Sequence, residues 1–87
     1  MPRNEIIIDT TIGMIRDELC RAMELWAPMQ SAHEGYAVIL EEMDELWEHV
    51  KMNQNRRDLG KMRTEAVQLA AMAARFVADL TLEGMPK

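Results

Sequence analysis

Apolar side chains recur every three or four positions in three long segments of this chain, a spacing that places them on one side of an α-helix. In the first segment these residues are Ile8, Ile12, Ile15, Leu19, Met23 and Trp26. Signals for β-structure are scarce, because few β-branched runs follow Ile8 and no Asn-Gly or Asp-Gly hairpin turn occurs. The sequence therefore predicts an all-α fold, a three-helix subunit that assembles into a helical bundle.

Helix-breaking and capping residues divide the chain into its expected parts. Pro28 ends the first helix. Ser31 and Glu34 form a capping box, in which the serine oxygen accepts a backbone N–H and the glutamate reaches back to the cap. Asp58 is the expected N-cap of the third helix, and Gly84 lies beyond its end. The single predicted domain, 1–87, then consists of an N-terminal extension (1–10), helices over 11–27, 31–51 and 59–82, and a basic loop over 52–58.

The two later helices differ in how much of their surface is apolar. The second helix has a wide apolar face formed by Tyr36, Ile39, Leu40, Met43, Leu46, Trp47 and Val50, opposite Glu34, Glu41, Glu45 and Glu48. The third helix has a face of large residues and an alanine face, which is formed by Val67, Ala70, Ala71, Ala74 and Ala78. A chain of 87 residues cannot surround such a helix alone. We expect a second copy to cover the alanine face in a homodimer or homotetramer.

Charge and cysteine content limit the class of protein. Ten Lys and Arg against fifteen Asp and Glu give a net charge of −5, which disfavours general nucleic-acid binding. No apolar run approaches the roughly 20 residues that a membrane span needs. The single Cys20 cannot form an internal disulfide, and the apolar run near the N-terminus is too short for a signal peptide. A cytoplasmic location is therefore expected.

An acidic run, Glu41-Glu42-Met43-Asp44-Glu45, is the densest candidate for chemistry. Carboxylates three or four positions apart on a helix repel one another, and a hard divalent cation reverses that repulsion. Mg²⁺ prefers oxygen ligands, takes one or two carboxylates and completes its shell with water or substrate phosphates. From periodicity alone, a solvated acidic face is the simpler interpretation.

The position of Glu65 also favours a metal site. It lies at the boundary between the large apolar face and a polar strip of Gln68, Arg75 and Asp79. A carboxylate there needs a cation, a proton or a basic partner, so a structural pair with arginine is the alternative. Antiparallel packing of the last two helices would direct Glu65 toward the acidic run, so that Glu41, Glu42, Glu45 and Glu65 converge.

These residues resemble the signature of the MazG-like, all-α nucleoside triphosphate pyrophosphohydrolases, which is Glu-Glu-x-x-Glu on one helix and Glu-x-x-Asp on the next. The first half matches at Glu41-Glu42-Met43-Asp44-Glu45, and the second begins at Glu65 but has Gln68 in place of aspartate. The resemblance covers roughly residues 31–80. The flanking residues 33–42 and 65–73 are similar to a small phage and bacterial branch of that superfamily.

The resemblance implies hydrolysis of nucleoside triphosphates to a monophosphate and pyrophosphate with Mg²⁺, a house-cleaning activity. It assigns both the catalytic and the metal-binding roles to the carboxylates of Glu41, Glu42, Glu45 and Glu65, and adds Gln68 as a further metal ligand. Gln68 removes one negative charge and should weaken Mg²⁺ binding. The alternative is a catalytically inactive interaction module of the same fold.

Candidate substrate-binding residues lie near the predicted loop. Five cations lie in or beside it: Lys51, Arg56, Arg57, Lys61 and Arg63. They form a possible clamp for the pyrophosphate group, although an ordinary solvated loop explains them equally well. Trp26, at the end of the first helix, is the better candidate to stack on a nucleobase, because Trp47 lies on the apolar face and is expected in the core.

Overall fold

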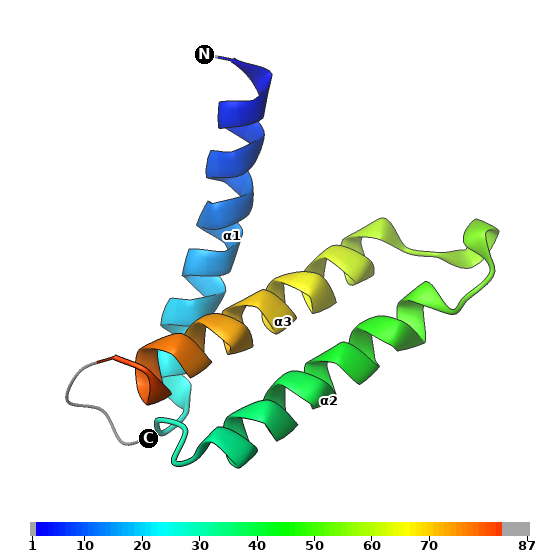
Figure 1. Ribbon diagram of the computed structural model, residues 1–87. Helices are drawn as coiled ribbons and strands as arrows, with labels where there is room; N and C mark the ends of the chain where they lie inside the picture. The colour runs from blue at the N-terminus through cyan, green and yellow to red at the C-terminus, as the bar shows by residue number, and fades with distance from the viewer. Residues whose placement is uncertain (1, 83–87) are drawn as a thin grey trace.

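The structure, a computed structural model, describes residues 2–82 (Figure 1). These residues form three α-helices and a short 3-10 helix, with no β-strand among them: α1 (Arg3–Leu25), α2 (Ala32–Val50), η1 (Gln54–Arg56) and α3 (Leu59–Leu80). The predicted all-α class is confirmed. Helices α2 and α3 run antiparallel, side by side, and α1 packs on α3. Within the described part of the chain no helix is long and apolar enough to cross a membrane.

Helix α1 starts much earlier than the sequence predicts. It begins at Arg3, so the expected extension over residues 1–10 is wrong for the residues that the structure describes. The backbone carbonyl of Pro2 accepts hydrogen bonds from the N–H groups of Glu5 and Ile6. No glycine or proline interrupts the chain between there and Gly13, so the helix continues without a break. Its last residue is Leu25, two positions before the predicted end.

The predicted caps of the two later helices are confirmed. Oγ of Ser31 accepts a hydrogen bond from the Glu34 N–H at 3.1 Å, and Oδ1 of Asp58 accepts one from the Lys61 N–H at 3.1 Å. The glutamate of the capping box reaches one residue further back than expected, because its Oε2 accepts the N–H of Gln30 at 2.8 Å. Helix α2 therefore starts at Ala32, and α3 runs from Leu59 to Leu80, with Gly84 outside the described residues.

Helix α2 turns a different face toward α3 than the sequence predicts. Gly35 is buried against Phe76 and Leu80. The other residues of α2 that are at least half-buried are Val38, Ile39, Glu42, Leu46, His49 and Val50, whereas Tyr36, Leu40, Met43 and Trp47 are exposed. The predicted apolar face is thus divided, and Trp47 is not in the core. Because Gly35 has no side chain, α2 and α3 can pack closely along the edge of α2 that contains it. Glu42 lies on the same edge and therefore faces α3.

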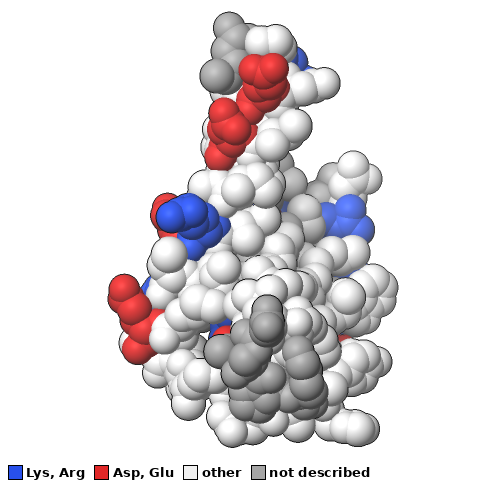
Figure 2. Space-filling view, turned by 60° about the vertical axis from the view of Figure 1, so that its left-hand side comes forward, with Lys and Arg blue, Asp and Glu red and all other residues white. Residues whose placement is uncertain are grey.

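The alanine face of α3 is partly covered by the same chain. Ala71 is fully buried with Ala22 of α1, and Leu19, Met72 and Val38 pack around them. The expectation that a second copy covers this whole face is therefore wrong at Ala71. The N-terminal half of α1 projects away from the two other helices (Figure 1), and all of residues 2–12 are exposed. Acidic side chains mark this projecting end (Figure 2).

Candidate metal centre and adjoining cleft

Three carboxylates converge where α2 and α3 face each other. Glu42 and Glu45 lie one turn apart on α2, and Glu65 lies on α3. Each offers an oxygen atom, and these atoms lie within 4.8 Å of one another. No other group of three or more potential metal-binding side chains of this kind occurs in residues 2–82. We call Glu42, Glu45 and Glu65 the carboxylate cluster.

Two oxygen atoms of the cluster have no hydrogen-bond partner. They are Oε2 of Glu42 and Oε2 of Glu65, and both are buried. A buried, unpaired carboxylate oxygen destabilises the fold unless a proton or a cation compensates it. Oxygen donors from three carboxylates suit a hard divalent cation such as Mg²⁺. The residues present therefore fit the metal that the sequence predicts.

The environment of the cluster favours protonated carboxyl groups when no cation is bound. The pKa of Glu42 is raised to about 7, chiefly by burial and then by its interactions with Glu45, Glu65 and Glu18, in that order. Burial also raises the pKa of Glu65, with Glu45 acting in the same direction and His49 opposing it. Near neutral pH, a bound cation would therefore displace protons from these groups.

His49 is the basic group closest to Glu65. Its Nε2 lies 3.9 Å from Oε1 of Glu65, which is within ion-pair range when the imidazole is protonated but too long for a hydrogen bond. The sequence left open a structural pair between Glu65 and an arginine, and no such pair occurs among the described residues.

A cleft of about 600 Å³ adjoins the cluster at Glu42. It lies between α1, α2, α3 and the linker that joins α1 to α2, and this volume is in the range of small-molecule sites. The lining residues used below are Trp26, Met29, Glu41, Glu42, Gln68 and Arg75. A smaller hollow of about 340 Å³ between α1 and α3 is lined by Arg63 and shares Glu18, Arg21 and Gln68 with the cleft.

The predicted site residues fall into three groups. Glu42, Glu45 and Glu65 form the cluster, while Glu41 and Gln68 line the cleft outside it. Trp26 also lines the cleft, with 62% of its surface exposed. Of the five cations in or beside the predicted loop, Arg63 lines the smaller hollow. The other four line neither hollow; these residues are Lys51, Arg56, Arg57 and Lys61.

Two of those loop cations already have partners within the chain. The guanidinium of Arg57 donates two hydrogen bonds to the carbonyl of Val50, at 3.1 and 2.8 Å, and so caps the C-terminal end of α2. Nζ of Lys51 lies 3.0 Å from Oε2 of Glu48. Contact between the loop cations and a substrate stays a prediction.

Glu18 and Arg21 are cleft residues that sequence reasoning missed. They form an ion pair at 2.6 Å on α1, and Glu18 is close enough to raise the pKa of Glu42. The available sequence signals were their spacing of three on a helix and their position beside the apolar residues Leu19 and Ala22. No protein-family model, curated protein or solved structure matches this chain.

Proposed function

We propose that this protein is a Mg²⁺-dependent hydrolase that converts nucleoside triphosphates to the monophosphate and pyrophosphate. The observation that carries the proposal is the carboxylate cluster, in which two buried oxygens lack any partner, at the edge of a cleft of nucleotide size. The resemblance to the MazG-like enzymes agrees with this interpretation. Nucleoside triphosphates are cytoplasmic metabolites, so the proposal also places the protein in the cytoplasm.

The proposed roles of the residues follow from their positions. Glu42, Glu45 and Glu65 hold the Mg²⁺, which when bound neutralises phosphate charge and lowers the pKa of a bound water. Glu41 lines the cleft but lies outside the cluster, so its carboxylate is free to accept a proton from the attacking water. Trp26 provides an exposed aromatic surface in the lining of the same cleft.

Gln68 favours a second candidate function. Its amide lines the cleft where the signature of the resembled family has a carboxylate, so the site has one negative charge fewer. A protein that had lost catalysis could keep the helical fold as an interaction module. Its exposed apolar side chains, such as Tyr36 and Leu40, would then serve binding.

The exposed surface of the chain supports assembly with a second copy. The chain exposes 6555 Å², whereas a folded monomer of this mass is expected to expose about 5,200 Å². The difference is comparable to the roughly 1,000 Å² or more that each partner buries in an obligate dimer. A homodimer, or a homotetramer made from it, would cover this excess and complete a helical bundle.

The α2 stripe is the surface that a second copy fits best; we define it as Tyr36, Leu40, Met43 and Trp47. These residues are spaced four, three and four positions apart, as in a coiled-coil seam, and all are exposed. An antiparallel pair of α2 helices would place Tyr36 against the partner's Trp47 and would separate the two copies of Asp44. A two-fold dimer needs only one such self-complementary surface.

The decisive experiment is a product analysis. Purified protein is incubated with Mg²⁺ and a panel of canonical and modified nucleoside triphosphates, and the phosphate products are separated. We expect monophosphate and pyrophosphate, and we expect no product with Glu65→Gln. Orthophosphate as the sole product would contradict the mechanism. No turnover of any triphosphate, with Mg²⁺ binding intact, would favour the interaction module.

A further inference from the structure

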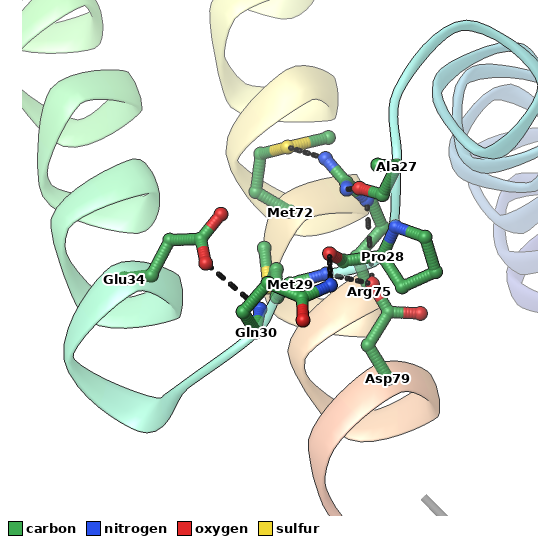
Figure 3. Close-up of polar contacts among 8 residues, drawn as sticks. All are labelled: Ala27, Pro28, Met29, Gln30, Glu34, Met72, Arg75 and Asp79. Carbon is green, nitrogen blue, oxygen red and sulfur yellow. Dashed lines mark hydrogen bonds and ion pairs between the residues drawn. The ribbon is translucent and has the colours of Figure 1, made fainter. Parts of the chain in front are cut away.

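The linker between α1 and α2, residues 26–31, is held against α3 by two buried charged residues. Arg75 is 5% exposed and Asp79 is 9% exposed. They lie one helical turn apart on α3, with Nε of Arg75 at 3.8 Å from Oδ2 of Asp79. Both were placed by the sequence on a polar strip, and the structure shows the linker lying over that strip (Figure 3).

Both residues bind main-chain atoms of the linker (Figure 3). Nη2 of Arg75 donates a hydrogen bond to the carbonyl of Ala27 at 2.8 Å. Oδ2 of Asp79 accepts a hydrogen bond from the N–H of Met29 at 3.0 Å. The side chain of Met29 is itself buried, and Nη1 of Arg75 contacts Sδ of Met72 at 3.6 Å. The linker is thus fixed at two points on either side of Pro28.

A buried ion pair is a poor way to increase stability alone. Removing two charged groups from water costs several kcal/mol, and apolar residues of similar size often stabilise a fold as well or better. What apolar residues cannot do is bind a carbonyl and an N–H group of the linker at the same time. The arrangement of Arg75 and Asp79 is therefore suited to fixing the path of the linker.

The path of the linker determines the shape of the cleft. Trp26 and Met29 line the cleft from the linker, and Arg75 lines it from α3. We propose that Arg75 and Asp79 are positioning residues that hold the linker as a preformed wall of the cleft, and that this cleft takes the flat heterocyclic base of a nucleotide against Trp26. The identity of this ligand rests on the proposed function, whereas the positioning does not.

The residues that line the cleft are chemically suited to bind a nucleobase. Apolar side chains of Val38 and Met72 line it together with the exposed indole of Trp26, and such surfaces accept a planar ring. Gln68 is half-buried, and its amide makes no hydrogen bond in the described residues, so it offers both a donor and an acceptor to a base edge.

The ligand is tested first without metal and without phosphate. In a Trp47→Phe background, Trp26 is the sole tryptophan, and its fluorescence is titrated with adenosine, cytidine, guanosine and uridine in the presence of EDTA. We expect saturable quenching by at least one nucleoside, because base stacking needs neither Mg²⁺ nor phosphates. No quenching by any of them at millimolar concentration overturns the assignment of the cleft, even if triphosphates are hydrolysed. Quenching without hydrolysis supports the cleft and contradicts the proposed function.

The positioning role is tested with Arg75→Met/Asp79→Leu, which replaces the buried charges by apolar groups and removes both contacts to the linker. We expect normal helix content, an unchanged Mg²⁺-dependent rise in melting temperature, and an about tenfold weaker nucleoside affinity with a matching rise in KM at constant kcat. The control, Glu48→Gln, weakens the exposed ion pair with Lys51 away from the cleft and should change none of these values.

Two results would overturn the positioning role. One is wild-type nucleoside affinity in the double variant, and the other is a parallel loss of the Mg²⁺ effect, which would indicate a general structural role. If the double variant does not fold, Arg75→Lys gives the same test, because it retains the charge opposite Asp79 but cannot keep the guanidinium geometry toward Ala27. Wild-type affinity in Arg75→Lys, together with an unchanged path of the linker, would then contradict the proposal.

Discussion

A Cβ atom on Gly35 would lie 2.6 Å from Cδ2 of Phe76, so these two residues determine how closely α2 and α3 approach. Two turns further along the same edge of α2 is Glu42, which belongs to the carboxylate cluster with Glu65 of α3. The close contact between Gly35 and Phe76 at one end of the α2–α3 pair therefore helps to bring the carboxylates of the cluster together further along the two helices.

Gly35→Ala should destabilise the protein despite the better helix propensity of alanine. Overpacking costs about 1–3 kcal/mol, and the gain from replacing a helical glycine is roughly 0.5–1 kcal/mol. Urea unfolding followed by circular dichroism measures the difference. Gly13→Ala is the matched control, because nothing lies within 4 Å of its added Cβ, and it should stabilise the protein. Equal stability of Gly35→Ala and wild type would show that the contact with Phe76 is not restrictive.

Magnesium should raise the melting temperature, because a ligand that binds only the folded state stabilises it by RT ln(1 + [L]/Kd), about 2.7 kcal/mol at 100 times Kd. Glu65→Gln should abolish this rise, measured by differential scanning fluorimetry with and without EDTA. Glu48→Gln, which alters an exposed carboxylate paired with Lys51 outside the cluster, should leave the rise unchanged. A full rise in Glu65→Gln would show that the metal binds elsewhere.

The stability of the metal-free protein should fall as pH rises from about 4.5 to about 7. The pKa of Glu42 is raised from 4.5 to about 7, so the folded state binds a proton more tightly than the unfolded chain. This contribution is fully present below the unfolded pKa and is lost as pH rises through the folded pKa. Urea midpoints measured in EDTA at several pH values should show the decline, and Glu42→Gln should reduce it. A pH dependence that is identical in the variant would contradict this assignment.

Gln68→Asp should strengthen Mg²⁺ binding. The substitution adds a carboxylate to the cleft that Glu42 also lines, and it introduces the residue that the signature of the resembled family has at this position. A calorimetric titration should give a lower Kd for Mg²⁺, and any hydrolase activity should rise with it. Gln54→Asp, in the 3-10 helix outside the cleft, adds the same charge at a distance and should not tighten Mg²⁺ binding. Weaker binding in Gln68→Asp would place the metal away from this residue.

Leu40→Glu should dissociate the proposed dimer. The variant places a carboxylate in the middle of the α2 stripe, opposite the partner's Met43, while Leu40 is 45% exposed in the single chain and outside its core. Sedimentation velocity at micromolar concentration should show a dimer or tetramer for the wild type and a monomer for the variant, with helix content retained. Ala74→Arg, on the alanine face beside α1, should mainly destabilise the chain. A monomeric wild type would remove the basis for this prediction.

Periodicity and capping predicted the fold class because these signals are local. Ser31 and Asp58 cap the helices that the sequence assigned to them. The buried face of α2 was not predictable in the same way, since its apolar residues extend over more than half of the helix surface. Gly35 decides which edge approaches α3, and a residue without a side chain adds nothing to a hydrophobic pattern.

Spacing along the chain was sufficient to predict that Glu42, Glu45 and Glu65 lie close together, because all three are on neighbouring antiparallel helices. The contact between Asp79 and the N–H of Met29 joins residues 50 positions apart. No local pattern predicts such a contact, which depends on how α1 and its linker pack on α3. The cleft was missed for the same reason.

The projecting half of α1 divides the chain into regions of unequal local stability. Its turns up to residue 12 are exposed, and a helical segment of about ten residues is barely stable through its own hydrogen bonds. Backbone amide hydrogens there should exchange with deuterated solvent much faster than those of the buried part of α3. Proteases should cut the same turns first, leaving a resistant fragment that begins within α1 and retains the cluster and the cleft.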